Sequence, residues 1–392
     1  MRLATAVWIA FPLATVAMGA TVKNLVVFGD SNSDVGNGQR WSEGPNWSEY
    51  LALGWNASLY SFAFSGSVCD TRMYESISSQ DRVPSLRDQL EAYYTLGLNL
   101  KPEETVYAFW LGVQDVFEMT KRHGRQEPEY KEITDCIGQQ LRAARKVFLS
   151  DRFLVLNLPP FEHMPYYQED QSSLNKSQAA VEINRGLEKD VANLNKHHHA
   201  LEMDYVDIHS LINDIIVDPS VFNFKEPLEP YLDTCYGKPD CTFNSVDYIW
   251  WDQTHFTSGF HKSIAQSIID AESYIPKVEL TEQLEEKLQN PKSKFRSKKY
   301  TVKPFKGIVD EQARLYDIQK SKPIQPQQPP LEDDLDPTMF AKDEHNTYIG
   351  LLAFFLTLGG IIAWIKFPHV VPFNWIRNRD RGKFIPVRNE EV

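Results

Sequence analysis

Short apolar runs alternate with longer amphipathic segments over residues 20–276, and this alternation constrains the fold more than any other feature. Strand-like runs cover residues 24–28, 105–111, 153–158 and 205–208, with a weaker one at 58–63. Apolar residues recur at helical spacing between them, as in residues 86–98 and 183–201. Strands that are apolar throughout are typical of parallel sheets covered by helices on both faces. We therefore expect an α/β domain with a mostly parallel sheet.

One serine follows directly after the first strand-like run. The sequence VVFGDSNSDVGN places Ser31 in a loop of small polar residues, and Gly112 and Gln114 follow the strand at 105–111 in the same way. Such loops are often plain turns, because Gly, Asp, Ser and Asn suit turn backbones. In parallel α/β sheets, however, ligands bind beyond the carboxyl ends of the strands. This placement favours a functional serine.

The chain contains a candidate for each part of a serine hydrolase site. Ser31 is the candidate nucleophile, and Asp252 and His255 in WWDQTHFT are close enough for the carboxylate to orient the imidazole base. The backbone N–H groups of Ser31 and Gly66 and the side chain of Gln114 are candidate donors to an oxyanion. Asp115 is expected to order its loop.

These segments resemble the four ordered blocks of the GDSL, or SGNH, hydrolases. The blocks are FGDSNSDVGN, the segment around Gly66, the segment GVQD and WDQTH, and the resemblance covers residues 21–276. More narrowly, the chain is similar to fungal GDSL acetylesterases of the carbohydrate esterase type. The resemblance implies a three-layer α/β/α, flavodoxin-like fold and metal-independent ester hydrolysis without a cofactor. It also implies Ser31 as nucleophile, His255 as base, Asp252 as its orienting group, and Ser31, Gly66 and Gln114 as the oxyanion hole.

Gln114 departs from the family pattern, which has asparagine at this position. Glutamine carries the same amide donor one methylene farther from the backbone, with one more rotatable bond. An oxyanion donor has to lie about 3 Å from the developing charge, and the loss of one donor costs roughly 10²–10³ in rate. Either the loop has shifted to accommodate Gln114, or catalysis is weakened. Our hypothesis is that Gln114 still donates.

The sequence favours one function and leaves two alternatives. The favoured function is hydrolysis of small acyl esters, such as acetyl groups on carbohydrates. A lipid acylhydrolase on the same fold is one alternative. An inactive esterase-like domain for carbohydrate binding or adhesion is the other, and the intact set of Ser31, Asp252 and His255 argues against it.

Two hydrophobic segments predict the location of the chain. Residues 1–19 have the charged, apolar and small-residue order of a secretory signal peptide, although an amino-terminal core helix is an alternative. Residues 347–366 carry an uncharged apolar run long enough to span a bilayer. Acidic residues precede this run and basic residues follow it in residues 367–392, which predicts a cytoplasmic tail and an extracellular or luminal domain. A glycolipid-anchor signal is the alternative, but such signals end in their hydrophobic tail.

The segment between the domain and the predicted membrane helix has a different composition. Within residues 277–346, a short charged helix is expected at 278–288, and residues 292–343 are rich in Lys, Pro, Gln and acidic residues, with KPIQPQQPP near the middle. We expect a charged stalk with too little apolar material to fold alone. Glycosylation sequons at Asn46, Asn56 and Asn175 all lie on the side predicted to be luminal.

Charge and cysteine content exclude other classes. The net charge of −12 and the lack of a basic stripe argue against nucleic acid as a partner. The four cysteines suit a secreted domain with one or two bridges, and no Cys/His spacing resembles a zinc site. Cys235 and Cys241 flank a turn-like insert and are expected to bridge each other, which leaves Cys69 and Cys136 to pair.

Two further groups of residues allow more than one interpretation. Trp41 and Trp47, near the first block, could line a sugar-binding cleft or pack in the core. The run of histidines at residues 197–199 is better explained as a solvated helix end than as a metal site, because adjacent helical side chains point in different directions.

Overall fold

The computed structural model describes residues 21–321, with gaps at 75–76, 78–81, 123–128, 168–172 and 199–200. The expected signal peptide at 1–19, the membrane helix at 347–366 and the tail at 367–392 lie outside the described residues. Within residues 21–321 and apart from those gaps, no helix has the length and apolar character needed to cross a membrane. Residues 21–317 belong to one compact unit.

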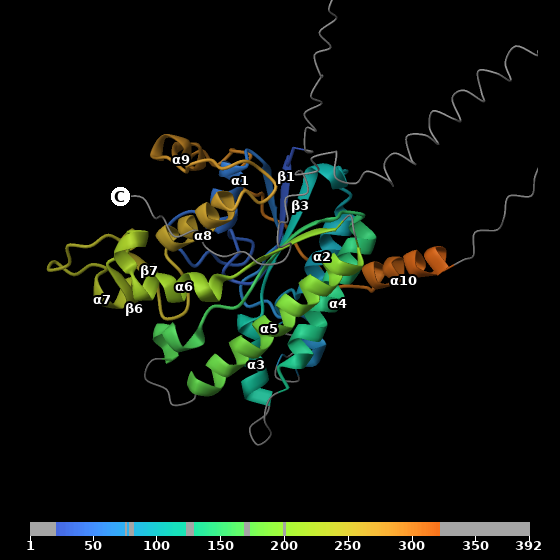
Figure 1. The fold of residues 1–392 in the computed structure, drawn as a ribbon, viewed down its shortest axis with the longest axis horizontal. Helices are drawn as coiled ribbons and strands as arrows, with labels where there is room; N and C mark the ends of the chain where they lie inside the picture. Colours follow the sequence, from blue (N-terminus) through green and yellow to red (C-terminus); the bar gives the residue numbers. More distant parts are fainter. Residues whose placement is uncertain are drawn as a thin grey trace, which may run out of the picture. The chain divides into compact units, whose positions relative to one another are not determined.

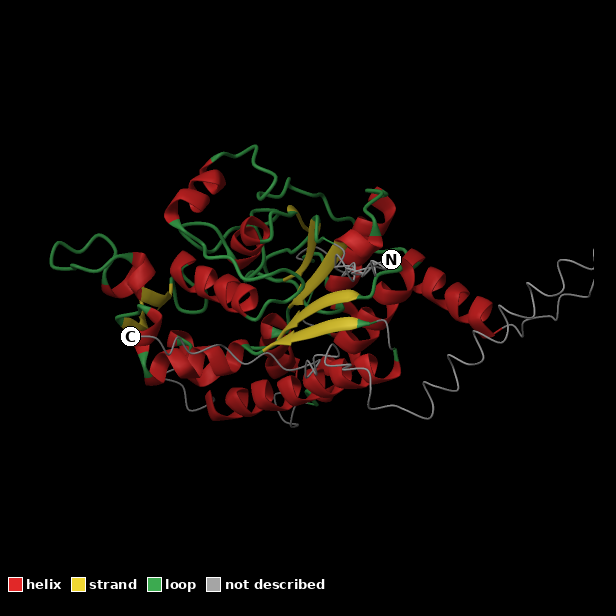
Figure 2. Ribbon diagram, turned by 45° about the horizontal axis from the view of Figure 1, so that its top comes forward, coloured by secondary structure: helices red, strands yellow, loops and turns green. Residues whose placement is uncertain are grey.

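A parallel five-stranded sheet forms the centre of this unit, as the sequence predicts (Figure 2). Its strand order is β2-β1-β3-β4-β5, and all neighbouring strands pair in parallel. The strands are β1 (Asn24–Gly29), β2 (Ser58–Ser61), β3 (Thr105–Trp110), β4 (Arg152–Leu156) and β5 (Glu202–Val206). All residues of β3 are buried, which explains its uninterrupted apolar sequence. The last strand begins earlier than expected, because polar residues alternate with buried ones at its start.

Helices cover both faces of the sheet and give the three layers (Figure 1). One layer contains the packed pair α1 (Trp47–Gly54) and α8 (Ser258–Asp270). The other contains α2 (Leu86–Leu96), α4 (Lys131–Phe148) and α5 (Ser173–His197), in which α4 packs on both α2 and α5. The predicted helices at 86–98 and 183–201 correspond to α2 and to the second half of α5. A Ser85 cap begins α2, and left-handed Gly97 ends it.

A smaller lobe follows β5. It contains α6 (Ile208–Val217), α7 (Tyr231–Thr234) and a parallel pair of short strands, β6 (Glu226–Pro230) and β7 (Tyr248–Trp250). Helix α3 (Val113–Arg122) follows β3. Short 3-10 helices connect the larger elements at η1 (Thr71–Met73), η2 (Pro102–Glu104), η3 (Phe161–His163), η4 (Pro165–Tyr167), η5 (Pro219–Phe222) and η6 (Ser245–Asp247).

Two disulfides confirm the expected pairing of the cysteines. Cys69 and Cys136 join the loop after β2 to α4, with their Cα atoms 6.3 Å apart. Cys235 and Cys241 close the short insert that follows α7, with their Cα atoms 5.2 Å apart.

Burial corrects one predicted glycosylation site. Asn46 is only 2% exposed, and its side chain caps α1 by accepting the N–H groups of Ser48 and Glu49. A glycan therefore has no route to its amide nitrogen. Asn56 lies exposed at the end of α1, and the side chain of Asn175 is outside the described residues.

The described part of the expected stalk is folded. A helix forms in the segment where a short charged helix is expected, whereas residues 292–321 differ from a free stalk because some of their side chains are buried. Helix α9 (Glu282–Gln289) contributes Leu288 to the main core, and Leu280 and Phe295 are buried there as well. Apolar residues that are spaced singly along a charged segment predict too little apolar material for the segment to fold alone. They are sufficient here because each fills a site on a core that already exists.

We call residues 293–307 the C-terminal strap, which leads into α10 (Ile308–Ser321). The strap covers the edge strand β2, where the Leu59 N–H donates to the Lys294 carbonyl at 2.9 Å. Tyr300 stacks on Phe62 with ring centroids 4.2 Å apart, and the ring of Phe305 lies under the guanidinium of Arg87 at 4.2 Å. The strap therefore protects an otherwise open sheet edge.

Candidate active site

The candidate residues lie near the point where the strand order of the sheet reverses. Strands β1 and β3 are neighbours, and the chain leaves β1 towards β2 on one side and β3 towards β4 on the other. Ser31 lies just after β1 and Gly112 just after β3. The crevice at such a switch point is the usual ligand site of an open parallel α/β sheet. Ser31 is half-buried in a tight turn, which the Ser33 N–H closes on the Asp30 carbonyl at 3.1 Å.

Asp34 organises the loop that carries Ser31. Its two carboxylate oxygens accept backbone N–H groups from four residues of the same loop at 2.7–3.0 Å, namely Gly36, Asn37, Gly38 and Gln39. It also accepts the N–H of Ser65 at 2.8 Å, in the loop after β2. One buried carboxylate thus holds together the Ser31 loop and the segment that contains Gly66.

Gly66 and Gly112 both need the conformational freedom of glycine. Their φ angles are +82° and +125°, in a region that residues with a Cβ rarely adopt. At Gly112 a Cβ would also lie 3.0 Å from the Leu158 side chain. The backbone requirement explains why both positions are glycine.

Gln89 connects the same two loops from α2. Its amide oxygen accepts the Gly29 N–H at 2.9 Å, and its amide nitrogen donates to the Gly29 carbonyl at 2.9 Å and to Ser67 Oγ at 2.8 Å. Gln89 is fully buried. The roles of Gln89 and of the Asp34 contact with Ser65 were not predicted, because both depend on backbone groups distant in sequence.

His255 and Asp252 lie in the loop between β7 and α8. His255 Nδ1 is 2.9 Å from Asp252 Oδ1 and 2.8 Å from Oδ2, and the His255 N–H also donates to Oδ1 at 2.8 Å. Burial tends to raise the pKa of Asp252, but the hydrogen bonds and charge of His255 outweigh it and lower that pKa. Since Nδ1 faces a carboxylate, Nε2 is the nitrogen left to accept a proton. Among the described residues Ser31 and His255 share no hydrogen bond, and such bonds are often long in unliganded sites.

Gln114 lies in the first turn of α3, with its amide nitrogen 3.0 Å from Glu118 Oε1, one turn farther along the same helix. Asparagine at this position would be one methylene too short for the same reach. The amide has two N–H groups, so the second remains a possible donor towards the end of β3. The longer side chain of Gln114 thus forms a hydrogen bond within its own helix.

Two buried carboxyl groups, Asp30 and Asp115, lie beside the loops of the site. Burial raises the pKa of Asp30 to about 7, against the lowering effect of the Asn32 N–H, and nearby Asp115 raises it further. Burial likewise raises the pKa of Asp115 to about 6, although the Cys69 N–H and the Tyr74 hydroxyl stabilise its charge. Asp115 accepts both of these groups at 2.8–3.1 Å, which agrees with the ordering role expected for it.

The two tryptophans have different environments. Trp47 is fully buried and packs edge-on against Trp110, so it belongs to the core. Trp41 is half-buried, and its ring lies parallel to the imidazole of His255. The core interpretation therefore holds for Trp47 alone.

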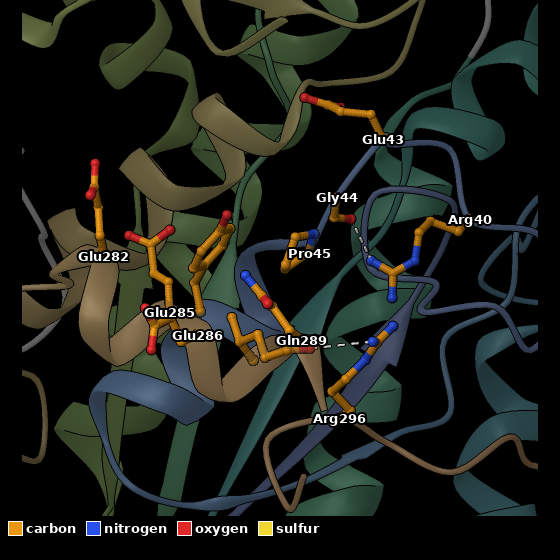
Figure 3. A pocket seen from close by; sticks show the side chains of 11 residues that line it. Arg40, Glu43, Gly44, Pro45, Glu282, Glu285, Glu286, Gln289 and Arg296 are labelled. Atoms are coloured by element: carbon orange, nitrogen blue, oxygen red, sulfur yellow. Dashed lines mark hydrogen bonds between the residues drawn. The ribbon is translucent and has the colours of Figure 1, made fainter. Parts of the chain in front are cut away.

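A polar cavity of about 590 Å3 lies beside the loop at residues 40–45, between α1 and α9 (Figure 3). Its lining includes several charged side chains, among them Arg40, Glu43, Glu282, Glu285, Glu286 and Arg296. Arg40 donates to the Gly44 carbonyl across its rim and Arg296 to the Leu288 carbonyl. None of Ser31, Gly66, Gln114, Asp252 and His255 lines it, so it is separate from the candidate active site.

No group of three or more metal-ligand side chains is arranged to hold an ion within the described parts of residues 21–321. Of the histidine run at 197–199, His197 ends α5, and His199 lies outside the described residues.

This combination of a parallel sheet, a serine at its switch point and an Asp–His pair defines the class of α/β hydrolytic enzymes. A family model for GDSL-like lipase/acylhydrolase matches residues 25–268. The chain belongs to this family, and thus to the carboxylic ester hydrolases.

Known proteins of this kind are similar at low identity. The thermolabile hemolysin of Vibrio parahaemolyticus is 22% identical over 281 residues, which cover 64% of this chain and 64% of the hemolysin. An acetylesterase of Thermothelomyces thermophilus is 24% identical over 292 residues, covering 65% of this chain and 90% of that protein. The crystal structure of an acetylxylan esterase from Geobacillus stearothermophilus aligns with 13% identity and a TM-score of 0.39, over 67% of this chain and 100% of that one.

Proposed function

We propose that this protein is a serine esterase that hydrolyses small acyl esters, with acetyl groups on carbohydrates as the preferred substrates. The observation that carries the proposal is the double contact of His255 Nδ1 with the Asp252 carboxylate, at 2.8 and 2.9 Å. It fixes the imidazole with Nε2 as its basic nitrogen, in the same unit as a serine at the sheet switch point.

In the proposed first step, Ser31 Oγ attacks the ester carbonyl while His255 Nε2 takes the hydroxyl proton. The backbone N–H groups of Ser31 and Gly66 and the amide of Gln114 stabilise the charge on the carbonyl oxygen. The C–O bond to the alcohol then breaks, and His255 returns the proton to the leaving oxygen. Water, activated by the same imidazole, releases the acid from Ser31 in the second step. Asp252 stays ionised and holds the imidazolium.

Two observations support a carbohydrate ester as the substrate. Acetylesterases and an acetylxylan esterase are among the similar proteins. Aromatic side chains also lie in and near the site: Trp41 stacks on His255, and Trp251, which precedes Asp252 in the sequence, stacks with Tyr231 at 5.6 Å. Half-buried aromatic rings around a few polar groups are typical of small-molecule sites. The match to the lipase/acylhydrolase family model keeps lipid acyl esters as the second candidate.

Labelling with a fluorophosphonate probe tests the nucleophile. We expect the full chain to be labelled and Ser31→Ala to lose the label, while Ser42→Ala in the neighbouring loop keeps it. A wild type that takes no label would overturn the proposal. Release of acid from acetyl, butyryl and long-chain nitrophenyl esters, and from acetylated xylan, then separates the two substrate classes.

We also propose a type I membrane topology, with the esterase domain extracellular or luminal. The two disulfides support an oxidising compartment, and the charges around residues 347–366 support a cytoplasmic tail. Protease protection of the tail, but not of the domain, in sealed membrane vesicles of known orientation tests this topology.

A further inference from the structure

We propose that Trp41 is a positioning residue for His255, which fixes the plane of the imidazole and stabilises its protonated form during the reaction. The proposal rests on the proposed function, because it assigns a role in the reaction to a residue outside the family's four blocks.

The stacking geometry carries the inference. The indole of Trp41 and the imidazole of His255 have ring centroids 4.7 Å apart and an interplanar angle of 5°. Asp252 holds the imidazole by its edge, and Trp41 covers one of its faces. Rotation of the ring about its Cβ–Cγ bond would break both contacts. The two residues thus restrain the imidazole in two perpendicular directions.

The indole is itself held from the oxyanion side of the site. Trp41 Nε1 donates to Ser65 Oγ at 2.6 Å, and Ser65 directly precedes Gly66. The Ser65 N–H in turn donates to Asp34, in the loop that carries Ser31. Trp41 therefore connects the base to the loops of the nucleophile and of an oxyanion donor.

The neighbouring Arg40 anchors the backbone of the same loop. Its guanidinium forms a double contact with the carboxylate of buried Glu49 in α1, at 2.7 and 2.9 Å, and also donates to the Gly44 carbonyl. A ring on an anchored loop loses little conformational entropy when it stacks. This makes Trp41 a fixed element of the site.

An aromatic face attracts a cation above it, so an imidazolium gains more from the stack than a neutral imidazole. The other ionisable groups near His255 do not substitute for this effect. Asp252 lies at the ring edge, and Arg40 carries a constant charge. In α8, burial, with the charges of Arg40 and His255, lowers the pKa of His261 to about 3, so His261 stays neutral.

The test compares Trp41→Leu and Trp41→Phe in the full chain, with acetyl nitrophenyl ester as substrate. Leucine fills space without an aromatic face, whereas phenylalanine keeps a weaker face and loses the N–H. For Trp41→Leu we expect kcat on the pH plateau to fall about tenfold or more, and the acidic midpoint of the kcat/KM profile to move down by about 0.5 to 1.5 pH units. Trp41→Phe should recover most of both effects. Tyr236→Leu removes an exposed aromatic side chain of the smaller lobe and should leave the midpoint in place.

A role as simple packing predicts a different result. It would make Leu and Phe equivalent, and any loss of kcat would come with an unchanged midpoint, which would overturn the inference. Thermal unfolding of each variant shows whether a loss of activity reflects a loss of fold. The proposed function fails separately: if Ser31→Ala keeps full activity, the esterase mechanism is wrong, whatever the Trp41 variants do.

Discussion

Replacement of Asp30 by asparagine should remove a large part of the pH dependence of stability. Asp30 is 1% exposed, and its Oδ2 is buried without a hydrogen-bond partner among the described residues, while Oδ1 accepts the Asn32 N–H at 3.1 Å. A carboxylate in this place is poorly solvated, so the folded protein favours the neutral acid, and burial raises the pKa of Asp30 to about 7. Asparagine keeps the shape and the acceptor oxygen and never ionises.

The direction in which stability changes with pH follows from the number of protons that the folded and unfolded states bind. Between about pH 4 and pH 7 the folded state keeps the Asp30 proton that the unfolded chain has released, so unfolding releases a proton. The contribution of Asp30 to the stability of the folded protein is therefore most favourable below about pH 4, and it decreases as the pH rises to about 7. A difference of about 3 units between the pKa values of Asp30 in the folded and unfolded states lowers the free energy of unfolding by about 4 kcal/mol at neutral pH and above. Relaxation of the structure around the carboxylate should reduce this loss to about 2–4 kcal/mol.

Urea unfolding of the wild type and Asp30→Asn from pH 4.5 to 8, with disulfides intact, measures this effect. The difference in the free energy of unfolding should grow with pH up to about 7 and then stay level. Asp115→Asn is the matched control: burial raises the pKa of Asp115 to about 6, so its difference should level off near that pH. Parallel stability curves for wild type and Asp30→Asn would refute the reasoning, because they would mean that Asp30 ionises equally easily in both states.

Three further outcomes follow from the site and the fold. In assays with acetyl nitrophenyl ester, Gln114→Ala should lower kcat by about tenfold to a thousandfold, and Gln114→Asn should lower it by much less. If neither variant changes kcat, Gln114 is excluded as an oxyanion donor. A chain ending after residue 321 should keep the thermal midpoint of the longer chain. A chain ending after residue 276 should lose solubility or unfold at least 10 °C lower, since three buried apolar side chains of residues 277–321 each contribute about 1.5–3 kcal/mol. Asn56→Gln should lose the mass of one glycan in the protein expressed through a secretory pathway, and Asn46→Asp should show no change, as read by mass spectrometry.

The central sheet could be predicted from sequence because its strands are buried on both faces. Continuous apolar runs such as residues 105–111 fit only a few environments, and the helical spacing between them leaves few ways to connect the strands. The short pair β6 and β7 was not predicted. Glu226–Pro230 contains two prolines and two acidic residues, so its sequence has no strand pattern, and the pairing depends on the contacts of the smaller lobe.

The candidate catalytic and oxyanion-hole residues were easier to predict than the residues that hold their loops in place. Ser31, Gly66, Gly112 and the pair Asp252 and His255 lie in short, recognisable segments. By contrast, Gln89 acts on backbone groups 60 residues away and Asp34 also holds the Ser65 N–H, 31 residues away, and a single sequence contains no pattern for such contacts. The stack of Trp41 on His255 bridges more than half of the described chain, which is why the sequence left its role open.

The C-terminal strap contacts the loop that carries the nucleophile through Asn37. The Tyr300 N–H donates to Asn37 Oδ1 at 2.8 Å, and Asn37 Nδ2 donates to the carbonyls of Ser61 and Ala63 at 2.8 and 3.0 Å. Asn37 also gives its backbone N–H to Asp34, which orders the turn after Ser31. Because both polar atoms of the Asn37 side chain are used in this way, displacement of the strap would leave its amide oxygen without this partner and loosen the loop. The segment that follows the family's matched region is thus part of the support for the nucleophile.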